Sequence, residues 1–366
     1  MFPRKSLLLK RMCVLVGVLA CVWWFGLVGP PPSDDVYLSV LLLNDTELLR
    51  TFDELNAELN LTYSAENRTL DEVRGYVARM RRNRPVNPHR FAYLINPSRA
   101  CDGAPVFLLV YVHSAPGHYR RRAVIRQTWG SVADFAVRVV FLLGRPDWKS
   151  MQDALHMEAD LYGDIIQEDF VDSYRNLTHK AVMALKWVSL HCTRARFVLK
   201  TDDDVFVNMF LLVRHLRRLE ATDGRPVRRL LQCMVWRRMK VMRDPKSKWY
   251  ISREEYRPDY FPTYCSGLAF LLSTDVVMSM YNASLSLPFF WVDDFYVTGL
   301  LAARVGVKHR SLAGAYNVRA NYFRQEFTDA QKQRTLMFGH VHDLNDFVEV
   351  WQQVVEYETR ADHPTT

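Results

Sequence analysis

The sequence lacks a glycine-rich phosphate loop, an internal repeat and any low-complexity segment over its 366 residues. Without that loop, a phosphotransferase that cradles phosphate groups in glycine-rich backbone is disfavoured. Cysteine is also scarce, with six in the chain, and two of these fall within an apolar N-terminal run. In contrast, the apolar fraction of 49% and the aromatic fraction of 13% are ample for a packed core in one large domain or two small ones.

Positive charge exceeds negative charge, and the formal net charge is +8. The excess is spread through arginine clusters rather than gathered in one tail. This distribution suits an anionic ligand or a location near a membrane, and by itself it gives no reason to expect a nucleic-acid partner. The clusters occupy residues 120–122, 217–218 and 237–238.

The N-terminal segment predicts a membrane anchor. Four Lys and Arg residues within positions 1–11 precede residues 12–29, an uncharged apolar run of 18 residues. This length is near the lower limit for crossing the ~30 Å hydrocarbon core, and the preceding positive charge predicts a cytosolic N-terminus. The alternative is a cleaved signal peptide, but Trp23, Trp24 and three prolines stand where small cleavage-site residues belong. We expect a cytosolic tail over 1–11, a signal anchor in the lipid bilayer over 12–29, and the remainder outside the cytosol.

Sequons for N-glycosylation agree with that topology. Three of them crowd into residues 44–69, which suggests an exposed, glycosylated stem over residues 30–100 with some helical content in 46–83. Asn96 is followed by proline and is excluded. The five sequons begin at Asn44, Asn60, Asn67, Asn176 and Asn282.

Four cysteines beyond the apolar run can form disulfides in an oxidising compartment. Cys101 and Cys192 each precede an apolar run that we expect to form a strand. If these strands are parallel neighbours, both cysteines lie at the same edge of the sheet. That arrangement favours a Cys101–Cys192 bridge and leaves Cys233 to pair with Cys265. Free buried thiols are the alternative.

Strands and helices alternate over residues 105–230, which is typical of a parallel, doubly wound α/β sheet. Apolar runs predict the strands, and helical spacing of apolar residues predicts the helices. The expected strands cover 106–113, 137–144, 163–169 and 196–202, and the expected helices cover 119–129, 148–162 and 176–192. Beyond residue 230 the pattern changes, with a strand expected at 267–273, a helix at 293–306 that ends at Gly306, and a closing helix at 344–358.

Three consecutive aspartates, Asp202, Asp203 and Asp204, follow the strand at 196–202. Ligands of open α/β sheets bind beyond the carboxyl ends of the strands, and a carboxylate cluster there suits a hard cation such as Mn²⁺ or Mg²⁺. In a turn at a strand end, two of the three side chains can point to one side while the middle one turns away. The alternative is an aspartate-rich turn or helix cap without a metal.

Five segments occur in order along the chain: RRRAVIRQTWG (120–130), EDFVDSYRNLTHK (168–180), KTDDDVFVN (200–208), YFPTYCSGLAFLLS (260–273) and WVDDFYVTG (291–299). Together they resemble the lumenal β-1,3-glycosyltransferase family, which includes β-1,3-galactosyltransferases and β-1,3-N-acetylglucosaminyltransferases. The resemblance covers about residues 105–355. It implies one GT-A type nucleotide-sugar-binding domain with a mostly parallel central sheet, placed here at 101–360, together with a UDP-sugar donor, a divalent metal and inversion at the anomeric carbon.

The resemblance also implies roles for residues near the aspartate cluster. Asp204 is expected to bind the metal directly, and Asp202 to face the ribose or to reach the metal through water. Asp203 is included among the residues expected at the donor cofactor. A histidine before the closing helix is expected as a further metal ligand, and His340 is the first choice over His342 and His309.

Basic residues are expected beside the nucleotide. Arg122 and Arg126 fall at the carboxyl end of the first strand, where uracil or phosphates would pass, and a solvated helix face is the alternative. Lys180 follows a family motif, but it can instead cap a local carboxylate.

Inverting transfer requires a base opposite the leaving group, which takes the proton from the acceptor hydroxyl. Asp294 matches the presumed base of the family, and Asp293 is expected to bind the acceptor or to act structurally. The chain departs from the family pattern with Asp293 at the first position and Phe295 at the third, where Glu and Val are usual. A helix N-cap is the alternative for one of the two acids.

The resulting hypothesis is a Golgi type II membrane enzyme, crossing the membrane once, that moves galactose from UDP-galactose to the 3-hydroxyl of an acceptor glycan in β linkage. The acceptor is expected on a glycoprotein, glycolipid or proteoglycan. UDP-N-acetylglucosamine and UDP-N-acetylgalactosamine are alternative donors. Two other classes stay open, a phosphotransferase or metal hydrolase that uses the same aspartates and a non-catalytic, membrane-tethered glycan-binding protein.

Overall fold

The computed structural model describes residues 87–132, 135–223, 226–329 and 331–362. The expected cytosolic tail (1–11), signal anchor (12–29) and first three sequons lie outside these described residues, as does most of the expected stem. Within the described residues, no helix is both long enough and apolar enough to cross a membrane.

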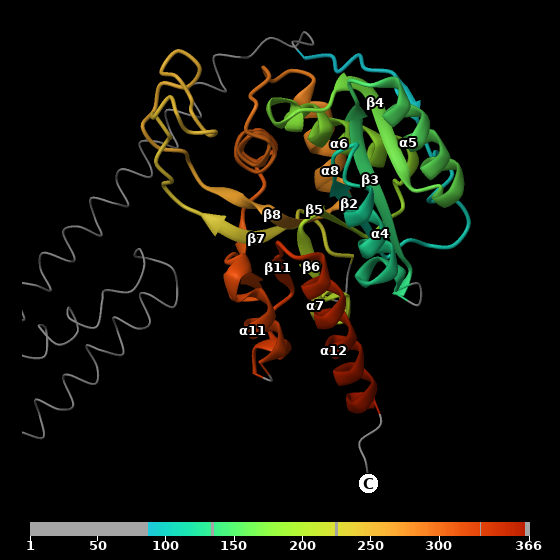
Figure 1. Cartoon of the computed structure of the whole chain (residues 1–366). Coiled ribbons are helices and arrows are strands. Elements are labelled where there is room, and N and C mark those ends of the chain that lie inside the picture. Colours follow the sequence, from blue (N-terminus) through green and yellow to red (C-terminus); the bar gives the residue numbers. More distant parts are fainter. Residues whose placement is uncertain (1–86, 133–134, 224–225, 330, 363–366) are drawn as a thin grey trace, which may run out of the picture. The chain divides into compact units, whose positions relative to one another are not determined.

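A mixed sheet runs through the centre of the described chain (Figure 1). Its eight strands, counted over the described residues, lie in the order β1-β4-β3-β2-β5-β8-β7-β9. The chain starts the parallel part at β2, adds β3 and β4 on one side and then returns to add β5 on the other, which is the expected doubly wound arrangement. The strands are β1 (Tyr93–Ile95), β2 (Leu108–His113), β3 (Val137–Arg145), β4 (Ile165–Val171), β5 (Phe197–Asp202), β7 (Leu231–Trp236), β8 (Tyr264–Ser273) and β9 (Arg310–Ser311).

The expectation of a mostly parallel sheet is only half right. β8 is antiparallel to both β5 and β7, and β1 is antiparallel to β4. Parallel neighbours need a long crossover, usually a helix, whereas antiparallel neighbours can be joined by a loop. β7 and β8 are joined by a loop without a helix, so their direction follows from the connection. A buried apolar run such as 267–273 predicts a strand but carries no information about its direction.

Helices cover both faces of the sheet, and those expected at 119–129, 148–162, 176–192 and 344–358 are present to within a few residues. The helices at 209–223, 274–284 and 323–328 were not predicted. The longer helices are α4 (Tyr119–Gln127), α5 (Lys149–Tyr162), α6 (Leu177–His191), α7 (Met209–Asp223), α8 (Thr274–Ser284), α11 (Phe323–Thr328) and α12 (Leu344–Asp362). Short 3₁₀ turns lie at η1 (Trp129–Ser131), η3 (Tyr174–Asn176), η5 (Ala313–Ala315), η6 (Ala320–Tyr322) and η7 (Lys332–Arg334).

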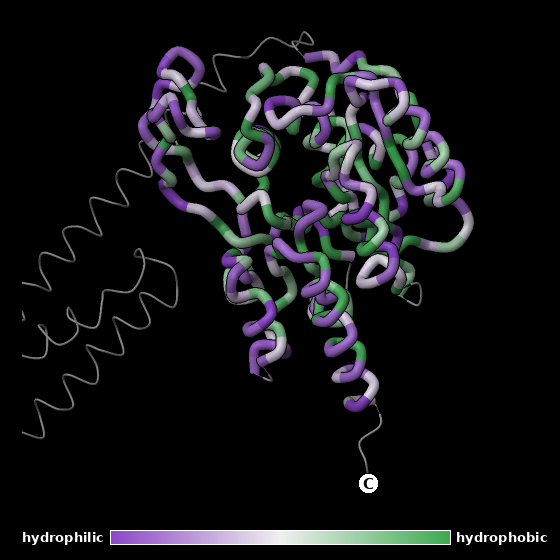
Figure 2. Tube along the Cα trace, in the orientation of Figure 1, coloured by the Kyte–Doolittle hydropathy of each residue, from purple (hydrophilic) through white to green (hydrophobic). Residues whose placement is uncertain are grey.

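Strand β2 explains why both faces must be covered. All six of its residues are buried. Successive side chains point to opposite faces of a strand, so one set packs on each side. Leu109 and Tyr111 belong to the core shared with α6 and α8, whereas Leu108 and Val110 belong to the core shared with α4, α7 and α12. Figure 2 shows hydrophobic residues gathered along these strands and hydrophilic residues in the outer loops.

A small second sheet branches from the aspartate cluster. It consists of β6 (Val205–Val207), β11 (Phe338–His340) and β10 (Tyr316–Asn317), in the order β10-β11-β6. Two residues separate the end of β5 from the start of β6, so Asp203 and Asp204 form the turn between the two sheets. His340 pairs with Val205 in the ladder, which brings it next to this turn.

The expected helix at 293–306 forms in three parts. These are α9 (Asp293–Phe295), a π-helical segment η4 (Tyr296–Leu301) and α10 (Ala302–Val305). Gly306 ends the run as expected, because its φ of 66° is a left-handed conformation that glycine adopts without a side-chain clash. Short π-helical turns are frequent at functional sites, and this one directly follows the acids Asp293 and Asp294.

Both expected disulfides are present. Cys101 pairs with Cys192, and Cys233 pairs with Cys265. The first bridge ties the segment before β2 to the end of α6, because the two parallel strands that follow these cysteines are neighbours. The second bridge joins β7 to β8 at a point where their pairing shifts register.

Candidate active site

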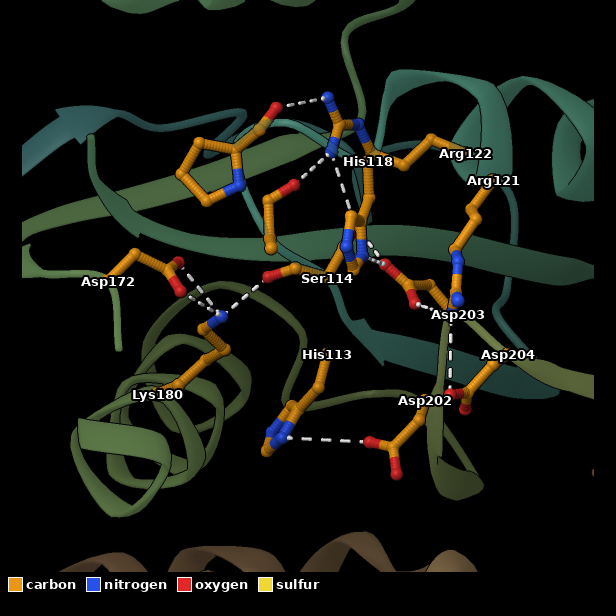
Figure 3. A network of polar contacts seen from close by, with 12 residues as sticks. His113, Ser114, His118, Arg121, Arg122, Asp172, Lys180, Asp202, Asp203 and Asp204 are labelled. Carbon is orange, nitrogen blue, oxygen red and sulfur yellow. Dashed lines mark hydrogen bonds and ion pairs between the residues drawn. The ribbon is translucent and has the colours of Figure 1, made fainter. Parts of the chain in front are cut away.

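The three strand-end aspartates point in different directions (Figure 3). Asp203, the middle one, turns away from the other two and is 5% exposed. Its carboxylate accepts hydrogen bonds from Ser114 Oγ at 2.7 Å and Arg121 Nη1 at 3.0 Å, and it lies 2.8 Å from His118 Nδ1. Since His118 and Arg121 lie at and within the first turn of α4, Asp203 anchors the strand-end turn to that helix.

Asp204 lies on the other side of the turn, between Arg121 and His340. Its Oδ2 is 3.2 Å from Arg121 Nη1 and 3.7 Å from His340 Nε2. Burial acts to raise the pKa of Asp204, but the interaction with His340 and the charge of Arg121 prevail and hold it below its usual value. The same interaction raises the pKa of His340 above its usual value.

Asp202 faces a different group, the buried ammonium of Lys200. Lys200 is 2% exposed, and its Nζ donates to Asp202 Oδ1 at 2.6 Å and to the carbonyl of Gly267. Although burial acts to lower it, the charges of Asp202 and Asp293 hold the pKa of Lys200 above its usual value. Desolvation raises the pKa of Asp202 to about 7, and Lys200 opposes this rise.

The two acids at the start of the helical run complete the group around Lys200. Asp294 Oδ1 accepts a hydrogen bond from the backbone N–H of Phe295 at 2.7 Å. The N-cap position is occupied by Val292, so neither acid is the helix cap. Burial, followed by the charge of Asp293, raises the pKa of Asp294 to about 7. Asp294 therefore retains a basic carboxylate near neutral pH.

A glycine stands where β8 passes these acids. A Cβ on Gly267 would lie 3.2 Å from Asp294 Oδ2, which is closer than most side-chain contacts. The missing side chain lets the backbone of β8 approach Asp294 on one side, while the Gly267 carbonyl receives Lys200 on the other.

His113 lies beneath the acids at the carboxyl end of β2. Its Nδ1 is 3.7 Å from Asp293 Oδ2 and 4.0 Å from Asp202 Oδ1, and neither ring nitrogen has a hydrogen-bond partner among the described residues. Burial, together with the charges of Lys200 and Lys180, lowers the pKa of His113 well below its usual value. The ring is therefore neutral, and it presents an imidazole to both acids.

A cavity of about 550 Å³ opens above this group. Four of its charged lining residues are buried or half-buried, and they are named the floor here: Lys200, Asp202, Asp293 and Asp294. Its walls are mainly aromatic and aliphatic, and aromatic faces are suited to packing against the apolar faces of a sugar ring. The aromatic lining consists of Tyr174, Trp236, Trp249, Phe261, Tyr264 and Trp291.

The two arginines expected at the nucleotide are engaged elsewhere. Arg122 is fully buried, and its guanidinium donates to both oxygens of Glu158, at 2.8 and 2.7 Å. Arg126 donates to Glu158 at 2.8 Å and to Asp164 at 2.7 and 2.8 Å. The alternative of a solvated helix face is wrong for both side chains. In this structure they join α4 to α5 and to the start of β4.

Lys180 caps a local carboxylate, which was the alternative to a position beside the nucleotide. Its Nζ lies 2.9 Å from Asp172 Oδ2 and donates to the carbonyl of Ser114 at 2.5 Å. Since Ser114 also donates to Asp203, Lys180 supports the strand-end turn through one intermediate residue. It is 2% exposed and does not line the cavity.

The expected metal ligands supply a suitable but incomplete set of donors. Asp204 and His340 lie together and offer the oxygen and nitrogen atoms that Mn²⁺ accepts. Asp202 is turned toward Lys200, and the described part of the chain contains no group of three His, Cys, Asp or Glu side chains arranged to hold a metal ion. A pair of this kind fits an ion that takes its remaining ligands from water and substrate phosphates.

Sequence reasoning missed three residues of this site, namely Lys200, His113 and Arg121. Lys200 lies two positions before the three aspartates, at the end of an apolar strand. A lysine at such a position needs a carboxylate partner, so the sequence contained a signal for its role. His113 is the last residue of an apolar strand, and the carboxyl end of a strand is where ligands of α/β sheets bind, so the sequence contained a signal for this residue too. Nothing in the sequence distinguishes Arg121 from its neighbours Arg120 and Arg122, because only the helix orientation decides which one faces the aspartates.

The sequence is similar to those of known proteins. The sequence model of the galactosyltransferase family matches residues 120–313. Human beta-1,3-galactosyltransferase 1 is 34% identical over 251 residues, which are 68% of this chain and 73% of that protein. The rat (Rattus norvegicus) lactosylceramide 1,3-N-acetyl-beta-D-glucosaminyltransferase is 34% identical over 270 residues, covering 71% of this chain and 65% of that protein.

Among solved structures, the chain is similar to the galactosyltransferase LgtC in complex with donor and acceptor sugar analogues. The two share 13% identity and a TM-score of 0.34, and the match covers 67% of this chain and 95% of that one. Mouse xyloside xylosyltransferase 1 matches at 10% identity and a TM-score of 0.31, over 65% of this chain and 98% of the other. At these scores neither likeness carries an argument about function.

The raised pKa of Asp294 predicts a change in stability with pH. A carboxyl group whose pKa is higher in the folded state than in the unfolded state contributes stability at low pH, and this contribution is lost as pH rises through the folded pKa. The relevant window for Asp294 extends from its ordinary pKa of 3.8 to about 7. Asp294→Asn should therefore be as stable as the wild type near pH 4 and more stable near pH 8, by at most about 4 kcal/mol.

Urea unfolding at a series of pH values measures this difference. Asp153→Asn is the matched control, because Asp153 is exposed on α5 and lies away from the cavity. A constant difference between Asp294→Asn and the wild type from pH 4 to pH 8 contradicts the prediction.

Proposed function

The chain belongs to the galactosyltransferase family, and on that premise we propose that it transfers galactose from UDP-galactose to the 3-hydroxyl of an acceptor glycan in β linkage. One observation carries the proposal. A candidate base, Asp294, and a strand-end acid, Asp202, line one aromatic-walled cavity next to the turn that presents Asp204. We also propose that the described domain is of the GT-A type, since its doubly wound half ends at that turn.

The transfer is a single displacement at the anomeric carbon. Asp294 takes the proton from the acceptor 3-hydroxyl, and the freed oxygen attacks the anomeric carbon from the face opposite the diphosphate. The bond between that carbon and the phosphate oxygen breaks, its electron pair leaves with UDP, and the configuration inverts. With a pKa of about 7, Asp294 is better matched to this task than an exposed aspartate.

Neighbouring residues prepare Asp294 for this step. Gly267 and the Phe295 N–H determine where its carboxylate lies. Lys200 supplies positive charge at the floor, which limits the repulsion between Asp293 and Asp294 before the proton is taken up. Asp293 is placed to hold the acceptor, and the aromatic walls exclude water from the sugar.

A divalent metal is part of the proposal. Asp204 and His340 would hold Mn²⁺ or Mg²⁺, with Asp202 reaching it through water, and the bound ion would neutralise the charge that develops on the diphosphate. Asp203 serves the donor by holding the turn in place. Arg122, Arg126 and Lys180 act here on the position of α4 and of the turn rather than on the nucleotide itself.

The alternative donor is UDP-N-acetylglucosamine. It is supported by the similarity to the rat transferase, whose identity of 34% equals that of the galactosyltransferase. The two donors differ at C2 and at C4 of the hexose, so a panel of UDP-sugars offered to the full-length chain, with transfer to lactose measured, separates them.

We further propose that the enzyme is a Golgi type II membrane protein anchored through residues 12–29, with the stem at 30–100 and the catalytic domain at 101–360 in the lumen. The basic flank and the uncharged run of 18 residues support this topology. Endoglycosidase treatment should lower the apparent mass of the full-length chain. An unchanged mass, with a protease-accessible C-terminus in intact vesicles, contradicts the topology.

Removing Asp204 should abolish the metal-dependent part of donor binding. Asp204→Ala leaves Arg121 paired with Asp203, so the turn should keep its place while the metal loses its carboxylate. Calorimetry of UDP with and without Mn²⁺ should show metal-enhanced binding in the wild type and in Asp153→Ala, but not in Asp204→Ala. Turnover that is unchanged in EDTA refutes the catalytic metal.

Replacing the base should slow catalysis and leave donor binding intact. Asp294→Asn keeps the side-chain shape but loses basicity, so kcat with saturating acceptor should fall by roughly 10²-fold or more. Asp293→Asn should mainly raise the acceptor KM. Donor Kd, measured by calorimetry, should change little in either variant. If Asp293→Asn loses kcat and Asp294→Asn keeps it, the two roles are reversed; if both keep it, neither acid is the base.

A further inference from the structure

The loop between β7 and β8, residues 237–263, carries a large share of the positive charge and is named the basic loop here. It contains eight Lys and Arg residues against four Asp and Glu residues, a net charge of +4 in a chain whose total is +8. It leaves the sheet as a long excursion, coloured yellow to orange in Figure 1, and much of it is hydrophilic in Figure 2.

The basic loop has a defined structure of its own. Arg243 donates to four carbonyl groups of the same loop, at distances of 2.6 to 2.8 Å. These bonds fold the segment back on itself and tie its two halves together. The cations that it carries are therefore presented at defined positions. The acceptors are the carbonyl oxygens of Ile251, Ser252, Tyr256 and Pro258.

Two lysines of the basic loop lie at the cavity. Lys240 lines it directly. Lys248 lies above two lining residues, with its Nζ 4.5 Å from the ring centre of Trp249 and 5.7 Å from that of Tyr174. Both lysines are exposed, so an incoming ligand can reach their ammonium groups.

The acids near these lysines are directed elsewhere. Asp259 pairs with Arg253 at 2.7 Å, and Glu255 lies 3.6 Å from Arg175. Asp244 accepts a hydrogen bond from the backbone N–H of Lys246. Across the described ranges, neither Lys240 nor Lys248 has a carboxylate within ion-pair distance. Their charge is therefore free to meet a ligand.

The charged residues at the cavity thus form two groups, one at the floor and one on the basic loop. Three carboxylates, Asp202, Asp293 and Asp294, lie at the floor, where Lys200 is the opposing cation. Lys240 and Lys248 lie at the side that the basic loop forms. A neutral sugar hydroxyl suits the floor, because an anion there would be repelled by the carboxylates. An anionic substituent suits the two lysines.

We propose that the acceptor is an anionic glycan, which places a neutral hexose at the floor and a sulfate or carboxylate group against Lys240 and Lys248. This inference rests on the proposed transferase function and specifies its acceptor class. Electrostatic complementarity of this kind selects among ligands and speeds their association more than it adds affinity. Its contribution is also reduced by salt, since both lysines are exposed.

The experiment compares three acceptors that share a terminal galactose with a free 3-hydroxyl. They are lactose, lactose sulfated at the galactose 6-position, and a disaccharide of galactose and glucuronic acid. Affinity for the full-length chain is measured in the presence of UDP by quenching of tryptophan fluorescence, because three tryptophans line the cavity. Transfer to each acceptor is measured separately.

At low salt at least one anionic acceptor should bind about tenfold more tightly than lactose, as expected for two exposed ion pairs. The preference should largely disappear at about 1 M salt, where the Debye length is about 3 Å. A gain confined to the sulfated acceptor identifies the anion as sulfate, and a gain confined to the uronate identifies it as carboxylate. Equal affinity for all three acceptors at low salt overturns the proposal.

Charge-removing variants locate the preference. In Lys240→Gln/Lys248→Gln the ratio of anionic to neutral affinity should fall to about one. Lys246→Gln removes one charge from the same loop away from the cavity and should keep the wild-type ratio. An equal loss in Lys246→Gln assigns the effect to the general field of the loop and overturns the assignment to the two lysines.

The affinity and transfer measurements separate the two hypotheses. Transfer without any anionic preference refutes the acceptor class and leaves the proposed function intact. If anionic acceptors bind more tightly in a manner that depends on the two lysines, but no UDP-sugar supports transfer, the proposed function is refuted and the anion-binding site is retained.

Discussion

A buried lysine surrounded by carboxylates is the interaction on which the rest of the site depends. Lys200 is 2% exposed, and its ammonium group reaches Asp202 and the carbonyl of Gly267. An enclosed ammonium without a counter-charge is costly, so the fold must keep acids within its reach. Conversely, Asp293 and Asp294 lie close enough together to raise the pKa of Asp294, and they need a nearby cation to ionise. The lysine and the acids therefore stabilise one another.

That requirement joins segments that are distant in sequence. Lys200 lies on β5, Gly267 on β8, and Asp294 at the start of the helical run. Thr298 completes the connection, because its hydroxyl accepts from the Cys265 N–H and donates to the carbonyl of Asp294. The acids are thus held by the sheet rather than by a flexible loop. A base in a defined position is what an inverting displacement requires, since the hydroxyl must approach from one direction.

A second set of buried ions supports the aspartate turn from behind. Asp203 holds Ser114 and Arg121, and Ser114 in turn receives Arg122, whose guanidinium is paired with Glu158. These contacts fix α4 against the strand ends without occupying the cavity. The cationic side chains of α4 and those of the basic loop therefore have different roles. Those on α4 shape the site from within, whereas those on the basic loop are left free at its outer side, where an anionic ligand can reach them.

Local patterns in the sequence determined the alternation of strands and helices, the family, and the position of the acids at a strand end and a helix start. These features depend on periodicity and on neighbouring residue types, which a sequence displays directly. Only the tertiary structure decided the direction of β8, the engagement of Arg122 with Glu158, and the contact of Lys200 with Gly267, 67 residues away. Side-chain direction and the pairing of distant charges arise from packing, and no local pattern records them.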